Sequence, residues 1–287
     1  MSDEHASIWS ALMQVAFRQD YVDAGGVRTR FAESGHEGAP AVVMLHGTGA
    51  HWETFARNLG PYGDHFRTVA FDMIGNGFTE RPDHPYEIEH YVAHTLAVMD
   101  ALGIERAHLV GTSLGSWVAA AFALRHPERV AKLVLMSVAG LVASEENMQR
   151  IVSTRMRAVE DPNRESIKAM FDHLIADEAN RLDDLVTVRQ AMYRQAGMVQ
   201  TMRNTLVLQD RAIRERNLLS EDDYRSIAHP TLTFASGLDV SEYSNTSRVV
   251  AGLMPNARVV EMADVKHWPH FEDAATFNAV SLAFLRQ

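Results

Sequence analysis

A serine between two glycines is the residue of this chain best suited to chemistry. Residues 111–115 read Gly-Thr-Ser-Leu-Gly, with an apolar run at 107–110 before them and an alanine-rich helical run after them. Glycines at both ends allow a strand to turn sharply into a helix, so the hydroxyl of Ser113 is exposed at the bend. The backbone N–H of Leu114 then points out of a helix N-terminus, where negative charge is stabilised. The pattern predicts a nucleophile, Ser113, and one oxyanion-hole donor, Leu114.

A serine nucleophile needs a base and an orienting acid, and the last fifty residues contain candidates for both. His267 lies between the last predicted strand and the last predicted helix, where an imidazole can take a proton at neutral pH. Asp239 follows the preceding strand, and the chain order Ser113, Asp239, His267 is the one that accompanies this type of serine turn. The alternatives are weaker. We expect the following helix to turn His270 away, and Asp264 is too close to His267 to reach its far nitrogen easily.

A second oxyanion-hole donor is expected from residues 46–49, which read His-Gly-Thr-Gly after a short apolar strand. Gly47 and Gly49 let the backbone approach a substrate, and we assign the N–H of Thr48 to the hole beside that of Leu114. Such donors contribute roughly 3–4 kcal/mol each to transition-state stabilisation. A phosphate-binding loop is disfavoured, because no Gly-Lys-Ser/Thr follows.

Alternating strand and helix patterns surround these residues. Apolar runs predict strands at 41–45, 67–71, 107–110, 132–136, 231–235 and 257–261, and helical spacing predicts helices at 52–59, 88–102, 114–125, 247–253 and 274–285. A hairpin is predicted from 21–23 and 27–32, and a short surface helix from the spacing of Ile8, Leu12, Val15 and Phe17. The alternation predicts an α/β fold in which both faces of a mostly parallel sheet are covered by helices.

The interval from about 140 to 227 breaks the alternation. It is rich in Glu, Arg, Met, Gln and Leu, with helical periodicity and no run typical of a strand. We therefore divide the chain into a first part of the core at 1–139, a helical cap at 140–227, and a second part of the core at 228–287 that carries Asp239 and His267. The cap is expected over the carboxyl edge of the sheet, where ligands bind in such folds. Its six methionines favour core filling, with a few as pocket residues.

Composition narrows the classes of function. The chain has 287 residues, 46% of them hydrophobic and 22% charged, as in a soluble globular protein with a sizeable core. Its net charge of −10 argues against broad nucleic-acid binding but leaves room for an anionic substrate, which needs one local cation. With no cysteine, disulfides and thiolate metal sites are excluded. We find no membrane-spanning run and no secretory leader, so a cytoplasmic protein without membrane contact is expected. The sequence is compatible with a homo-oligomer.

Together these motifs resemble the α/β-hydrolases over essentially the full length of the chain. That resemblance implies a mostly parallel eight-stranded sheet with helices on both faces and a helical cap insertion. Within that superfamily, the chain is most similar to the meta-cleavage-product hydrolases, which cut a C–C bond in 2-hydroxy-6-oxo-dienoates formed by ring opening of aromatic compounds. The likeness includes the loop Phe-Asp-Met-Ile-Gly-Asn-Gly-Phe-Thr at 71–79 and Trp268, directly after His267. It also includes Leu-Val-Thr-Val-Arg at 185–189 in the predicted cap.

The resemblance implies substrate-binding roles for several residues. The family places an arginine that binds the acidic head of the substrate at the position of Arg189, and a guanidinium can hold a carboxylate through two hydrogen bonds. A solvated helix face is the alternative for Arg189, and a core position is the alternative for Trp268. Thr112 stands where the family often has an asparagine that helps to bind the head, and Thr54 lies near the position of a second such asparagine. Gly47, Gly49 and Thr112 complete the expected substrate-binding set.

Three functions follow from these residues. The first is a C–C hydrolase without metal or cofactor, acting on a small molecule with an acidic head through Ser113, His267 and Asp239. The second is a carboxylesterase or lactonase that uses the same residues on a C–O bond. The third is a ligand receptor with a hydrolase-like pocket, which an intact set of three residues disfavours.

Overall fold

The sheet of this computed structural model has eight strands, and the structure describes residues 7–239 and 241–287. The strands are β1 (Phe17–Ala24), β2 (Val27–Ser34), β3 (Ala41–Leu45), β4 (Arg67–Phe71), β5 (Ala107–Thr112), β6 (Val130–Met136), β7 (Thr231–Ser236) and β8 (Ala257–Met262). Their spatial order is β1-β2-β4-β3-β5-β6-β7-β8. β1, β2 and β4 pair antiparallel, and all pairs from β4 to β8 are parallel. The mostly parallel eight-stranded sheet predicted from the sequence is therefore confirmed.

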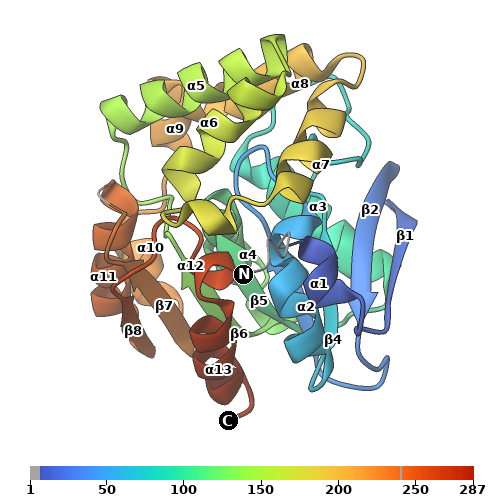
Figure 1. Cartoon of the computed structure of the whole chain (residues 1–287). Helices are drawn as coiled ribbons and strands as arrows, with labels where there is room; N and C mark the ends of the chain where they lie inside the picture. The colour runs from blue at the N-terminus through green and yellow to red at the C-terminus, as the bar shows by residue number, and fades with distance from the viewer. Residues whose placement is uncertain (1–6, 240) are drawn as a thin grey trace.

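Helices cover both faces of this sheet because its central strands are apolar on both sides. These helices are α1 (Ile8–Leu12), α2 (Ala56–Gly63), α3 (Ile88–Ala101), α4 (Leu114–Arg125), α11 (Glu242–Leu253), α12 (Pro269–Glu272) and α13 (Ala274–Leu285). In β3, Val42 and Met44 pack in the same cluster as Leu59 of α2, while Val43 and Leu45 pack in the cluster that holds Trp117 of α4. α1, α2, α12 and α13 belong to the first layer, and α3, α4 and α11 to the second (Figure 1).

Six further α-helices lie in the chain between β6 and β7, and we call this segment the helical insertion. They are α5 (Glu145–Glu160), α6 (Arg164–Leu174), α7 (Asp183–Tyr193), α8 (Met198–Thr205), α9 (Arg211–Asn217) and α10 (Glu221–Ser226). Short 3₁₀ turns occur at Trp52–Phe55, Pro127–Arg129, Glu178–Asn180 and Leu206–Gln209. In Figure 1, α5 to α8 lie across one end of the sheet, while α2, α12 and α13 lie along one face.

The N-terminal region differs from the sequence prediction. α1 ends at Leu12, and Phe17 begins β1 instead of continuing a helix. β1 is an edge strand whose residues Arg18, Gln19 and Asp20 are exposed, so it lacks the apolar run by which strands were recognised. The predicted helix at 52–59 is also divided, since a 3₁₀ turn at Trp52–Phe55 precedes α2.

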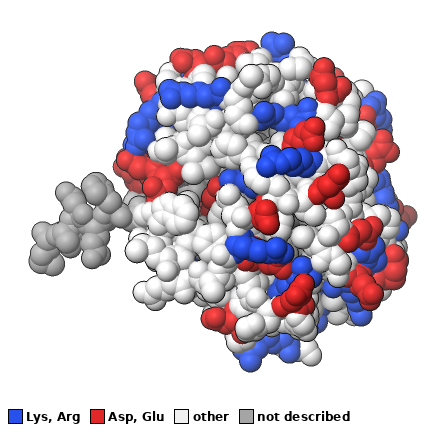
Figure 2. Space-filling model, turned by 90° about the vertical axis from the view of Figure 1, so that its right-hand side faces the viewer, with Lys and Arg blue, Asp and Glu red and all other residues white. Residues whose placement is uncertain are grey.

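Acidic and basic side chains of the described residues are interspersed on the face shown in Figure 2, beside a broad uncharged area. None of the helices in the described part of the chain is long and apolar enough to cross a membrane.

Candidate active site

Ser113 occupies a strained turn between β5 and α4. Its φ of 54° and ψ of −118° lie in a region that residues other than glycine rarely adopt. Crowding explains both flanking glycines: a Cβ at Gly111 would lie 2.3 Å from the carbonyl oxygen of Gly115, and one at Gly115 would lie 2.0 Å from that of Leu45. The turn is held by a hydrogen bond of 3.1 Å from the N–H of Ser113 to the carbonyl of Met136. Ser113 lines a cavity of about 390 Å³.

His267 lines the same cavity and is fixed by contacts on several sides. Its Nδ1 lies 2.8 Å from Asp239 Oδ2, which leaves Nε2 as the nitrogen available to a partner in the cavity. The backbone of His267 donates to the carbonyl of Leu174 at 3.1 Å and accepts a hydrogen bond of 2.7 Å from the hydroxyl of Ser137. The ring of Tyr243 packs edge-on against the imidazole, with 4.8 Å between centroids.

Asp239 is held in its ionised form. Burial alone would raise the pKa of its carboxyl, but hydrogen bonds from His267 and Ser241 and the nearby imidazole lower that pKa to about 2. Its second oxygen, Oδ1, accepts hydrogen bonds from the backbone N–H and the hydroxyl of Ser241. An ionised carboxylate at Nδ1 fixes the tautomer in which Nε2 of His267 is unprotonated and can act as a base.

The two rival residues lie elsewhere. His270 is the second residue of α12 and is buried among aromatic rings, with Phe55 at 5.0 Å and Trp268 at 6.0 Å between centroids. Burial lowers the pKa of His270 to about 3, so this imidazole is neutral. Asp264 is exposed to solvent. The structure therefore places Asp239, and not Asp264, against the ring of His267.

The loop at residues 46–49 borders the cavity next to Ser113. A Cβ at Gly47 would lie 3.4 Å from that of Ser113, so glycine allows this close approach. Thr48 lines the cavity, and its N–H has no backbone partner in the described part of the chain. The N–H of Leu114 is at the first position of α4, where a helix offers no internal partner. Both predicted donors are therefore available to a ligand oxygen.

Neighbouring residues fix this loop in shape. The side chain of His46 bridges it, with Nδ1 2.8 Å from the carbonyl of Gly47 and Nε2 accepting from the N–H of Met73 at 3.0 Å. Burial lowers the pKa of His46 to about 3, which keeps the ring neutral in that role. Gly49 has φ of +67°, and its N–H donates to the side-chain oxygen of Asn76 at 3.0 Å.

Arg189 comes from α7 of the helical insertion and enters the cavity wall as an unpaired cation. Its side chain is fully buried, and none of its three guanidinium nitrogens has a hydrogen-bond partner in the described structure. The rings of Phe171 and Tyr193 lie 5.5 Å and 5.7 Å from its Cζ and give partial compensation. The alternative of a solvated helix face is therefore wrong for Arg189, because its side chain is buried. A buried cation without a partner is costly, and a bound anion would offset that cost.

The remaining predicted substrate-binding residues divide into two groups. Trp268 is 2% exposed and lines the cavity, so it is both buried and part of the wall. Gly47 also belongs to the wall, whereas the described wall residues do not include Gly49 or Thr112. The hydroxyl of Thr112 is buried without a hydrogen-bond partner in the described residues.

Comparison with known proteins identifies the family of this chain. The sequence model of the family described as "alpha/beta hydrolase fold" matches residues 40–274. The chain belongs to the α/β-hydrolase fold family. It is 31% identical over 270 residues to a 2-hydroxymuconate semialdehyde hydrolase of Pseudomonas sp. strain CF600, with 92% of each chain covered. It is 30% identical over 257 residues to a 2-hydroxy-6-oxo-6-phenylhexa-2,4-dienoate hydrolase of Comamonas testosteroni, with 86% of this chain and 88% of that protein covered.

A solved structure supports the same fold. The 2-hydroxy-6-oxo-6-phenylhexa-2,4-dienoate hydrolase of Rhodococcus sp. strain RHA1 superimposes with a TM-score of 0.82, covering 96% of this chain and all of that one at 23% identity. The sequence relatives place the chain in the meta-cleavage-product group of the α/β-hydrolases, and this structure supports the fold.

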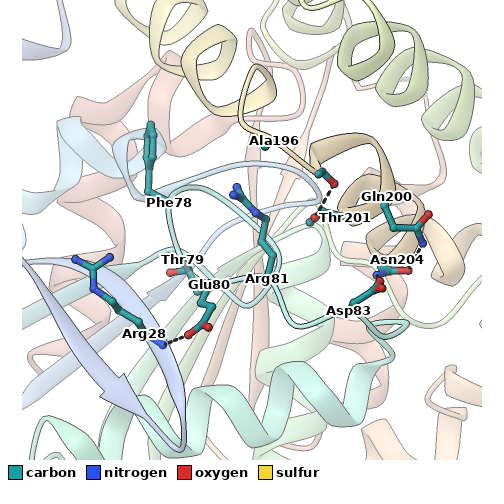
Figure 3. A pocket seen from close by; sticks show the side chains of 11 residues that line it. Arg28, Phe78, Thr79, Glu80, Arg81, Asp83, Ala196, Gln200, Thr201 and Asn204 are labelled. Carbon is teal, nitrogen blue, oxygen red and sulfur yellow. Dashed lines mark hydrogen bonds between the residues drawn. The ribbon is translucent and has the colours of Figure 1, made fainter.

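A second pocket of this α/β-hydrolase, of about 600 Å³, does not have Ser113 among its described wall residues. Figure 3 shows the side chains that line it. It is bordered by β2, by the segment after β4 and by α8. Its charged groups are partly satisfied within the protein: the N–H of Arg28 donates to Glu80 at 3.0 Å, and Asn204 donates to Asp83 at 3.1 Å. The cavity that holds Ser113 and His267 is therefore the candidate active site.

Sequence reasoning missed three residues that shape the site. Ser137 supports the backbone of His267, Tyr243 packs on its ring, and Arg155 of α5 lines the cavity. Tyr243 and Ser137 follow predicted strands, which is a signal for their place at the carboxyl edge. Arg155 lies in a charged helix and resembles any other arginine there, so the sequence contains no signal that it lines the cavity.

Proposed function

We propose that this enzyme hydrolyses the bond between C5 and C6 of a 2-hydroxy-6-oxo-dienoate, with Ser113 as nucleophile, His267 as acid and base, and Asp239 as the residue that orients it. The observation that carries the proposal is a single cavity that holds Ser113, His267 and the unpaired cation of Arg189. A hydrolase of simple esters has no need of a buried guanidinium with three free nitrogens. A substrate with a carboxylate at one end and a carbonyl at the other does.

The residues suggest the order of steps. Arg189 binds the carboxylate of the dienoate, and His267 assists the transfer of the enol proton to C5, which gives a keto form. Ser113 Oγ then adds to the C6 carbonyl while Nε2 of His267 takes its proton, and the N–H groups of Thr48 and Leu114 stabilise the oxyanion.

Collapse of this adduct breaks the C5–C6 bond. The electron pair passes into the 2-oxo-enoate fragment, which takes the proton held by His267 and leaves as a 2-hydroxydienoate, and the acyl group stays on Ser113. His267, now neutral, deprotonates a water that hydrolyses the ester, and then returns that proton to Ser113. The products are a 2-hydroxydienoate and a carboxylic acid, with one water consumed.

The test uses the colour of the substrate. Dienolates with several different groups at C6 are mixed with the enzyme, visible absorbance is followed, and both products are identified. Loss of absorbance with formation of the 2-hydroxydienoate supports the proposal. Unchanged absorbance with every dienoate, together with fast turnover of p-nitrophenyl esters that Arg189→Met does not affect, would instead identify a carboxylesterase.

A further inference from the structure

The active-site cavity contains a second buried arginine, which the reaction described above does not use. Arg155 projects from α5, is 8% exposed and lines the cavity together with Arg189 of α7. Its only hydrogen bond in the described structure is a long one, 3.5 Å from Nε to the carbonyl of Thr48. Within residues 7–239 and 241–287, neither guanidinium forms an ion pair with a carboxylate.

An unpaired cation in this position is costly to the free enzyme. Burial lowers the pKa of Arg155 to about 10; Tyr193 opposes this shift, while the positive charges of Arg189 and Arg150 act in the same direction as burial. Two buried cations that repel one another destabilise the ligand-free protein, and a bound anion offsets that cost. Since Arg189 can hold one carboxylate through both arms of its guanidinium, Arg155 is left for another group.

The position of Arg155 indicates which part of the substrate it meets. Its Nε contacts Thr48, whose N–H we assign to the oxyanion of the C6 carbonyl. The cavity-facing side of α5 runs on from Arg155 through Ile151 to Asn147, which donates to Glu242 of α11 at 2.6 Å. We therefore expect the group attached to C6 beside Arg155, along this side of α5.

The outer part of the cavity is also charged. Arg150, Lys266 and His173 line it, and the acidic side chains there are Glu146 and Glu242. Glu242 accepts a hydrogen bond from Asn147, and Arg150 donates to the same asparagine. The whole wall carries four Lys or Arg residues and three carboxylates, and the two buried arginines among the four have no carboxylate partner among the described residues, which favours an anion beside them.

We propose that the natural substrate is a dianion, with its dienoate carboxylate on Arg189 and a second acidic group, on the C6 substituent, bound by Arg155. This inference rests on the proposed C–C hydrolysis. Water adds hydrogen to the dienoate fragment and hydroxyl to the acyl fragment, so the second acidic group leaves with the acyl fragment. The released acid is a dicarboxylic acid when that group is a carboxylate.

The experiment compares two dienoates that differ only at the end of the C6 substituent, one with a 2-carboxyethyl group and one with the neutral 2-carbamoylethyl group. We measure kcat/KM for both with the wild type, Arg155→Gln, Arg155→Lys and the control Arg157→Gln, an exposed arginine on the same helix. The wild type is expected to prefer the acid by about 30-fold or more. Arg155→Gln should bring this ratio close to one, Arg155→Lys should keep part of it, and Arg157→Gln should leave it unchanged.

Two results would overturn the inference while leaving the proposed reaction intact. One is a wild type that turns over the amide as well as the acid. The other is an Arg155→Gln enzyme that slows on both substrates by the same factor, as expected if Arg155 shares the dienoate carboxylate with Arg189 or has a purely structural role. If Arg155→Gln does not fold, the ratio in the wild type and in Arg155→Lys decides. Failure to cleave any dienoate would remove the proposed reaction and the inference together.

Discussion

Replacing Arg189 by methionine should make the enzyme less active and its free form more stable. Methionine is of comparable length and apolar, so it fills the buried site between Phe171 and Tyr193 without a charge. In the wild type, the guanidinium is fully buried and its three nitrogens have no partners among the described residues. A residue that serves only the fold would show the opposite stability change, because its loss would destabilise the protein.

The magnitudes follow from the two states of the cavity. Leaving a substrate carboxylate without its charged partner costs about 3 kcal/mol, which corresponds to a roughly 150-fold fall in kcat/KM. Removing an unsatisfied buried cation should increase the free energy of unfolding of the ligand-free protein by about 2 kcal/mol, and this should raise Tm by about 4 °C. Both numbers concern the same side chain, measured with and without ligand.

The assay pairs steady-state cleavage of a 2-hydroxy-6-oxo-dienoate with thermal unfolding of the ligand-free enzyme. Arg194→Met is the matched control, because Arg194 is exposed at the end of the same helix, and it should change neither quantity. A fall in Tm for Arg189→Met, with kcat/KM within threefold of the wild type, would refute the role of Arg189 in substrate binding.

Three further changes test other parts of the site and its support. Asp239→Asn should lower kcat by about 10³-fold in steady-state assays, since the amide no longer holds the required tautomer of His267; a loss below tenfold would contradict this. Gly115→Ala should lower the free energy of unfolding in urea by more than about 3 kcal/mol, because its Cβ would lie 2.0 Å from a backbone carbonyl, whereas Gly252→Ala, with open space around it, should be neutral or stabilising. Burial would raise the pKa of Glu53, but a neighbouring histidine and Arg30 lower it to about 2. This depressed pKa stabilises the fold above about pH 4.5 and ceases to do so as pH falls towards 2, so Glu53→Gln should flatten the pH dependence of unfolding in that window.

The sequence predicted the sheet and the serine turn because both depend on local signals. Short apolar strands, glycine stops and helical spacing occur within a few residues of one another, and α4 and α13 begin and end where the spacing placed them. β1 was the exception at its start: its exposed polar residues carry no apolar signal, and its pairing with β2 supplies the missing stability.

Contacts between distant segments could not be derived in the same way. Ser137 and His267 are 130 residues apart, and Arg155 and Thr48 are 107 residues apart. Helical periodicity shows that α5 is amphipathic, but it cannot show that its arginine enters a cavity formed by loops from the other part of the chain. Burial of Arg189 without a partner is likewise a property of the packed fold.

The most direct test of the proposed chemistry is a single-turnover measurement with Ser113→Ala. A coloured dienolate is mixed with excess wild-type or variant enzyme, and both the absorbance and the appearance of the 2-hydroxydienoate are recorded. We expect the variant to bind the dienolate but to cleave its C5–C6 bond at least about 10⁴-fold more slowly than the wild type. Cleavage by Ser113→Ala within tenfold of the wild-type rate would contradict the assignment of Ser113 as the nucleophile.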